Sequence, residues 1–172
     1  FNSFLESIKK TIIPIAKKSN VSCDFQTENN IKIKIDPDRM KQVIINLVKN
    51  AIEASNDNGM VQIISYKDDK NFYLDIKDNG VGMTKEVMDN LLKPLKKKKK
   101  DGTGLGVSLS NEIIIAHGGQ LKYSSKVNEG SVSKIILPLL SSQILFIIDS
   151  LIPCSQKQRV NFLFLYLKAP PP

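Results

Sequence analysis

The stretch DPDRMKQVIINLVKNAIEA, residues 36–54, carries the clearest secondary-structure signal of the chain. Asp36 can accept hydrogen bonds from the free amides of a helix start, and Pro37 suits the first turn, where no N–H is needed. Apolar residues then recur at helical spacing, namely Met40, Val43, Ile44, Leu47, Ala51 and Ala54. The sequence therefore predicts a long helix that packs one face on a core.

Three polar residues stand beside this apolar stripe. Asn46, Asn50 and Glu53 are separated by four and then three residues, so they project from one face of the helix. Asparagine has a low helix propensity and is costly to bury without a hydrogen-bond partner. From the helix alone two interpretations stay open, a solvent-facing stripe and a set of side chains that binds a ligand.

Two glycine-rich segments follow, Asp78-Asn79-Gly80-Val81-Gly82 and Gly102-Thr103-Gly104-Leu105-Gly106. The first comes at the end of an alternating strand pattern, where it could also be a capped turn. The second runs directly into a helical pattern, and the free amides of a helix start favour an anion. Neither segment has Walker or Rossmann spacing. Together they indicate a phosphate-containing ligand, and a nucleotide above all.

The remaining periodicity predicts further helices and strands on both sides of these motifs. We expect helices over 3–19, 84–92 and 105–116, the first carrying Pro14 and the last closed by His117-Gly118-Gly119. We expect strands over 21–26, 31–35, 59–66, 71–77, 120–125 and 131–137. The first two strands are expected to form one hairpin, and 59–66 with 71–77 a second.

Composition sets broader limits. The 172 residues are 41% hydrophobic, which is enough for one core, so we expect one domain over 1–140 and a tail over 141–172. The chain begins at Phe1 and has no signal-peptide pattern, so we expect it to be part of a longer polypeptide, and its apolar runs are too short to span a bilayer. Cys23 and Cys154 form no metal-binding pair.

The net charge of +8 is local, because Lys96 to Lys100 supply five of the positive charges. The run has no interleaved aromatic residues and the chain has no Trp, so a single-stranded nucleic-acid reader is disfavoured. A solvated loop and a segment that covers a polyanion such as a triphosphate both remain open. We expect no nucleic-acid partner.

At this point the residues resemble a known family, the ATP-binding catalytic domain of bacterial sensor histidine kinases, within the group that includes gyrase-type ATPases. Residues 42–54 look like its N box, 78–82 its G1 box and 102–106 its G2 box, followed by the familiar Ala116-His117-Gly118-Gly119. Each motif alone is weak, but three in the right order are specific. The resemblance covers about residues 1–139 and implies an α+β fold, a two-layer sandwich with helices on one face of a mixed, mostly antiparallel sheet.

The resemblance also implies roles for single residues. Asp78 would accept a hydrogen bond from the adenine amino group, with Gly80, Gly82 and Met83 beside the base. Asn50, with Asn46, would ligate Mg²⁺ between the phosphates of ATP, and Glu53 would lie in the same site. The phosphate oxygens would be held by the segment that comprises Thr103, Gly104, Leu105 and Gly106.

Position 46 bears on the reaction. The ATPase branches have a glutamate there that activates water, whereas Asn46 is a poor base, so the resemblance favours phosphoryl transfer to a protein. The acceptor would be a histidine on a dimerisation domain outside this chain, and a response regulator would be served indirectly. His117 is expected to be an ordinary helix cap. We expect a cytoplasmic domain, and the resemblance is compatible with a homodimeric parent at the inner membrane.

Three alternatives stay open. The chain could be a nucleotide-binding regulator without catalysis, a related serine kinase or ATPase, or a basic nucleic-acid-binding domain. The resemblance also implies a flexible lid over ATP, here residues 93–103. This lid segment departs from the family pattern, because Pro94 is followed by Leu95 and the lysines rather than by aromatic residues and threonines. The tail carries an apolar run over 162–167 with no assigned role.

Overall fold

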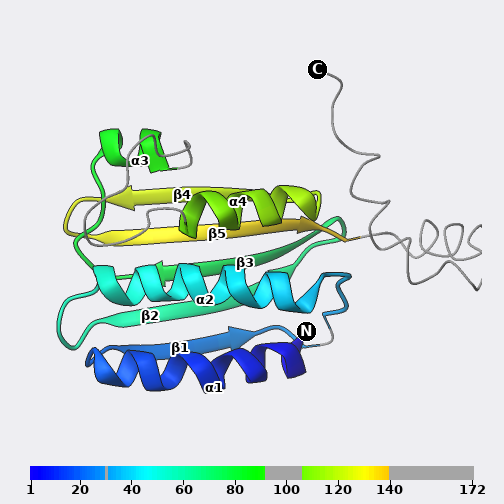
Figure 1. Ribbon diagram of the computed structural model, residues 1–172, viewed down its shortest axis with the longest axis horizontal. Helices are drawn as coiled ribbons and strands as arrows, with labels where there is room; N and C mark the ends of the chain where they lie inside the picture. Colours follow the sequence, from blue (N-terminus) through cyan, green and yellow to red (C-terminus); the bar gives the residue numbers. More distant parts are fainter. Residues whose placement is uncertain (30, 92–105, 140–172) are drawn as a thin grey trace, which may run out of the picture.

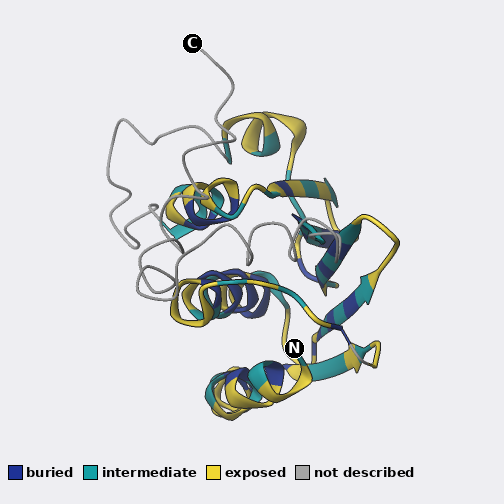
Figure 2. Ribbon diagram, turned by 90° about the vertical axis from the view of Figure 1, so that its right-hand side faces the viewer, coloured by how far each residue is buried: buried dark blue, intermediate teal, exposed yellow. Residues whose placement is uncertain are grey.

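The computed structural model describes residues 1–29, 31–91 and 106–139 of the chain, and they form two layers (Figure 1). One layer is a five-stranded sheet in the order β1-β2-β3-β5-β4. The other consists of the helices Asn2–Lys18, Pro37–Ala54 and Gly106–Ala116, which lie on one face of that sheet, as the side view shows (Figure 2). The expected α+β two-layer sandwich is confirmed.

The sheet is mixed. Its strands are β1 (Ser22–Thr27), β2 (Met60–Lys67), β3 (Asn71–Asp78), β4 (Gln120–Lys126) and β5 (Gly130–Pro138). Strands β1 and β2 run parallel, and all other neighbours are antiparallel. The expected hairpin β2–β3 is present, and the last two predicted strands, β4 and β5, form another.

The helices in the described ranges are α1 (Asn2–Lys18), α2 (Pro37–Ala54), α3 (Lys85–Leu91) and α4 (Gly106–Ala116). Helix α2 begins as predicted, because the Asp36 carboxylate accepts hydrogen bonds from the amides of Asp38 and Arg39, each at 3.0 Å. Helix α1 continues through Pro14. Among the described residues, no helix combines the length and the apolar character needed to cross a membrane.

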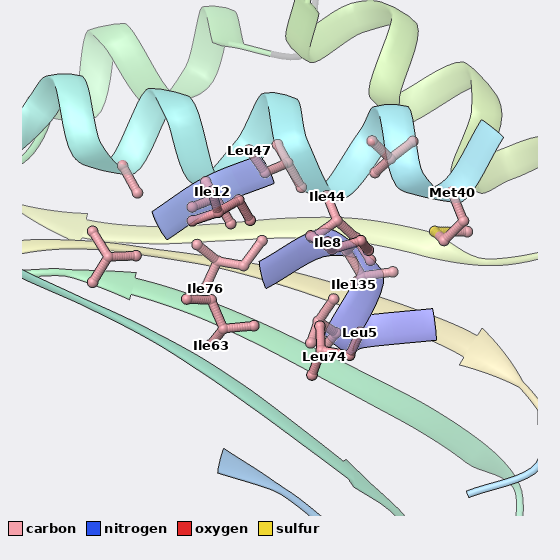
Figure 3. Packing of buried hydrophobic residues seen from close by; sticks show 14 of the residues in the cluster. Leu5, Ile8, Ile12, Met40, Ile44, Leu47, Ile63, Leu74, Ile76 and Ile135 are labelled. Carbon is pink, nitrogen blue, oxygen red and sulfur yellow. The ribbon is translucent and has the colours of Figure 1, made fainter. Parts of the chain in front are cut away.

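The core lies between the layers (Figure 3). Helix α1 contributes Leu5, Ile8, Ile12 and Ala16, and α2 contributes the predicted stripe from Met40 to Ala51. The sheet contributes alternate residues, and the largest of their fully buried side chains are Ile63, Phe72, Leu74, Ile76 and Ile135. The alternate buried residues of the strands and the helically spaced apolar residues of α2 therefore pack together in one apolar layer.

The expected hairpin of residues 21–26 with 31–35 is wrong. Strand β1 pairs in parallel with β2, Ser22 opposite Met60, and residues 31–36 form an extended connection to α2 without strand pairing. The alternation of the isoleucines is still meaningful, because Ile31 is buried while Ile33 and Ile35 pack against the core. An alternating pattern reports which side chains face the core and does not report which backbone pairs with which.

Candidate functional site

Asp78, at the end of β3, has a half-buried carboxylate, and one of its two oxygens accepts hydrogen bonds within the domain. Its Oδ1 accepts hydrogen bonds from the amides of Gly80 at 3.0 Å and Ser131 at 3.2 Å. Among the described residues, no hydrogen bond engages Oδ2. Burial raises the pKa of the Asp78 carboxyl above its ordinary value, and the two amide hydrogen bonds oppose that rise. The arrangement leaves a fixed acceptor atom for a further donor.

The loop that follows Asp78 packs directly against the end of α2. The amide of Val81 donates to the carbonyl of Ala54 at 3.0 Å, and a Cβ placed on Gly80 would lie 2.0 Å from that carbonyl oxygen. Glycine at position 80 is therefore required by contact between two backbones. Gly82 adopts a φ of +66°, which also favours glycine.

The far side of this loop is held by β4. The amide of Met83 donates to Ser125 Oγ at 2.7 Å, and Ser125 Oγ in turn lies 2.9 Å from the Ser131 hydroxyl. Ser131 donates its own amide to Asp78, as described above. Sequence reasoning missed Ser125 and Ser131, although both flank the turn Asn128-Glu129-Gly130 close to the predicted site.

A second part of the site lies where α2 meets α4. Asn46 Nδ2 donates to the buried hydroxyl of Ser110 at 3.0 Å, and a Cβ on Gly106 would lie 2.3 Å from Asn46 Oδ1. Gly106 therefore allows the first turn of α4 to approach the Asn46 amide oxygen. Asn46 is not a solvent-facing residue, whereas Asn50 and Glu53, on the same side of α2, are exposed.

The structure thus connects the site residues in two groups through α2. Gly80, next to Asp78, lies against the C-terminal end of α2, while Gly82 and Met83 lie against the end of β4. Asn46 with Gly106 lie about 12 Å back along α2, at ~1.5 Å per residue. Thr103, Gly104 and Leu105, like the lid segment 93–103, lie outside the described residues. Within the described ranges, no cluster of three or more His, Cys, Asp or Glu residues suited to a metal occurs.

His117 has both ring nitrogens engaged. Nδ1 lies 2.7 Å from the carbonyl oxygen of Ile113, and Nε2 accepts from the amide of Asp36 at 3.0 Å. The imidazole therefore caps the end of α4, as expected, and also connects it to the start of α2. Because the Asp36 amide can only donate, the Nδ1–H tautomer satisfies both contacts.

Comparisons with known proteins agree with this geometry. The model of the family described as "Histidine kinase-, DNA gyrase B-, and HSP90-like ATPase" matches residues 35–141. Sporulation kinase C of Bacillus subtilis is 34% identical over 142 residues, which are 81% of this chain and 33% of that protein. The sensor histidine kinase ZraS of Escherichia coli is 32% identical over 139 residues, 80% of this chain and 30% of that protein.

Solved structures give the same result. The catalytic domain of histidine kinase ThkA aligns with a TM-score of 0.72 and 31% identity, covering 80% of this chain and 92% of that domain. The chain spans about a third of the length of the curated relatives it matches. The chain therefore belongs to the histidine kinase-, DNA gyrase B- and HSP90-like ATPase family, as the ATP-binding catalytic domain of a sensor histidine kinase.

Proposed function

We propose that this domain binds ATP with Mg²⁺ and presents the γ-phosphoryl group to a histidine on a separate dimerisation domain. The observation that carries the proposal is the Asp78 carboxylate, half-buried, oriented by two amides, and left with Oδ2 as a fixed acceptor. A purine amino group is a donor of the right kind for that atom.

The base is proposed to lie along the loop after Asp78. Gly80 and Gly82 let that loop pack against the backbone of α2 and β4, and Ser125 fixes it through the Met83 amide. Met83, which is partly buried, supplies an apolar side chain beside the base. Binding at this end is therefore proposed to depend on one charged acceptor within a rigid frame.

The phosphates are proposed to lie near the start of α4. Asn46, Asn50 and Glu53 offer oxygen ligands of the kind that Mg²⁺ prefers, and the Asn46 amide oxygen already faces Gly106. When bound, Mg²⁺ would neutralise charge on the phosphate oxygens. The amide of Gly106, together with Thr103, Gly104 and Leu105, would hold phosphate oxygens at a helix start.

The reaction is proposed to be transfer to a protein, because position 46 carries an amide that cannot serve as a base for water. His117 is a poor candidate acceptor, since both of its nitrogens are engaged in contacts between α4 and α2. The acceptor would be supplied by the dimerisation domain of a homodimeric parent, and a response regulator would then receive the phosphoryl group. The solved complex of ThkA with response regulator protein TrrA supports such a partner, at 27% identity. The domain would act in the cytoplasm, its parent at the inner membrane.

Calorimetric titration with ATP, in the presence and absence of Mg²⁺, tests the binding step. We expect Mg²⁺ to strengthen ATP binding in the wild type, and Asn50→Ala to remove most of that gain because one oxygen ligand is lost. Asn56→Ala is a matched control, since Asn56 is an exposed asparagine just beyond α2. Equal affinity with and without Mg²⁺ in the wild type would reject the metal role.

The transfer step needs a supplied dimerisation domain that carries a phosphoacceptor histidine. Incubation with γ-labelled ATP should label that partner and leave the catalytic domain unlabelled. The His117→Gln variant should label the partner in the same way, because His117 is not the acceptor. A domain that binds ATP with Mg²⁺ but never labels any such partner would be a nucleotide-binding regulator instead.

A further inference from the structure

The inner face of the sheet, which is the face that the helices cover, changes from apolar to polar towards Asp78. Neighbouring strands place residues in rows, and one row consists of Leu74, Ile135 and Leu121. The next two rows are Ile76, Ser133 and Tyr123, and then Asp78, Ser131 and Ser125. On β4 and β5, the two rows nearest Asp78 therefore carry hydroxyl groups where the rest of that face carries hydrocarbon.

This polar end lies beside the loop already assigned to the nucleotide. Ser131 donates its amide to Asp78, and Ser125 holds the Met83 amide. Figure 1 shows α4 in front of the part of β4 and β5 that is far from their connecting turn, so the part near the turn lies beyond the α4 ribbon. We call the rows of Tyr123 and Ser133 and of Ser125 and Ser131 the polar floor. A polar surface of this kind is expected where a polar ligand, rather than an apolar helix face, completes the packing.

Tyr123 carries an unsatisfied group in this floor. Its hydroxyl is fully buried and has no hydrogen-bond partner among the described residues, although Ser133 lies directly opposite. Burial raises the pKa of the Tyr123 hydroxyl to about 12, and the Ser133 side chain lies close enough to oppose that rise without reaching hydrogen-bond geometry. The group is therefore a neutral hydroxyl able to donate, and leaving it unpaired costs about 1–3 kcal/mol.

Among the described residues, two other buried side-chain polar atoms lack partners, and neither lies in this row. Ser65 Oγ is on β2 opposite Leu74, in the apolar part of the inner face. Asp75 Oδ1 is on the opposite face of the sheet, where the second oxygen of the same carboxylate lies 3.2 Å from Lys134 Nζ. Tyr123 is the member of this set that stands next to the Asp78 row.

We propose that Tyr123 is a nucleotide-contacting residue whose hydroxyl hydrogen-bonds to the nucleoside end of ATP. This proposal rests on the proposed function and adds a contact to it. The nucleoside end is favoured over the phosphates because Tyr123 and Asp78 both belong to the sheet, whereas Asn46 and Gly106 belong to the helix layer. The nucleotide would give this hydroxyl the well-aligned hydrogen bond that Ser133 does not supply.

Calorimetric titration of Tyr123→Phe with ATP and with ADP tests the contact. We expect both nucleotides to bind about fivefold to tenfold more weakly, since ~1.4 kcal/mol corresponds to a factor of ten and a single hydrogen bond contributes about that much. The loss should be equal for ATP and ADP because the terminal phosphate is elsewhere. The free domain should be as stable as the wild type or more stable, because the change removes a buried hydroxyl without a partner.

Tyr66→Phe is the matched control. Its hydroxyl accepts from Lys134 Nζ at 2.8 Å on the outer face of the sheet, so removal should leave nucleotide affinity within twofold of the wild type. A second variant, Tyr123→Met, should repeat the loss of affinity, and a cooperative urea transition shows that each variant folds.

Wild-type affinity in a folded Tyr123→Phe protein would overturn the role of Tyr123 and leave the proposed function intact. A loss confined to ATP, with ADP unaffected, would also overturn it by placing the contact at the terminal phosphate. Failure of the wild type itself to bind ATP would contradict the proposed function, and with it the basis of this contact.

Discussion

At the scale of single residues, the fold and the proposed function favour opposite protonation states of the Asp78 carboxyl. Burial disfavours the ionised carboxylate and raises its pKa, yet the ionised form is the better acceptor for a base amino group. The native domain therefore retains a proton at pH values where the unfolded chain has lost it. Its stability falls as pH rises from the ordinary carboxyl value through the raised native one, because the unfolded state then binds fewer protons.

Asp78→Asn separates the two effects. The new amide oxygen can still accept from Gly80 and Ser131, so we expect the variant to fold, with higher stability than the wild type at neutral pH and no gain in strong acid. ATP affinity should fall at least tenfold, because hydrogen bonds to charged groups contribute ~1.5–3 kcal/mol. Urea denaturation across pH and calorimetry measure the two quantities. Wild-type ATP affinity in this variant would contradict the assigned role.

At the scale of elements, the loop after β3 is fixed by its distance from α2. A Cβ on Gly80 would lie 2.0 Å from the carbonyl oxygen of Ala54, which is backbone that cannot rotate away. We expect Gly80→Ala to destabilise the domain by more than about 3 kcal/mol in urea denaturation, because it must displace either the end of α2 or the Asp78 loop.

Gly118→Ala provides the control for that change. Gly118 has a φ of +72°, but a Cβ there would meet only a side-chain carbon of Pro138 at 3.6 Å. The substitution should cost about 1–2 kcal/mol through backbone strain alone. Equal losses for the two glycines would show that conformation, and not the contact with α2, fixes position 80.

The elements also show how far sequence reasoning reaches. The start of α2 was predictable because its cap is local. The Asp36 carboxylate accepts hydrogen bonds from amides only two and three residues further along the chain. The pairing of β1 was not predictable, since its partner β2 follows the whole of α2. The roles of Ser110 and Tyr123 depend likewise on register and helix packing between distant segments, and isolated serine or tyrosine residues carry no motif.

At the scale of the whole molecule, the described residues form one continuous core. Helix α1 lies outside the family match at 35–141 but buries Leu5, Ile8, Ile12 and Ala16 against the same sheet. Removing residues 1–20 would expose that apolar surface, and each large buried aliphatic side chain is worth roughly 2–5 kcal/mol. The structural unit therefore extends beyond the family match at its N-terminal end.

The C-terminal boundary is a separate prediction, that residues 141–172 lie outside the folded unit. Strand β5 ends at Pro138, and the amide of Leu139 donates to the Lys70 carbonyl at 2.7 Å, so all five strands of the described sheet lie before residue 140. A chain ending at residue 140 should keep its free energy of unfolding within about 0.5 kcal/mol and its ATP affinity within twofold.

A chain lacking residues 1–20 is the contrast and should lose its cooperative transition. A loss of more than about 1 kcal/mol on removal of 141–172 would mean that the apolar run over 162–167 packs on the domain, because buried apolar area stabilises by roughly 25 cal/mol per Å².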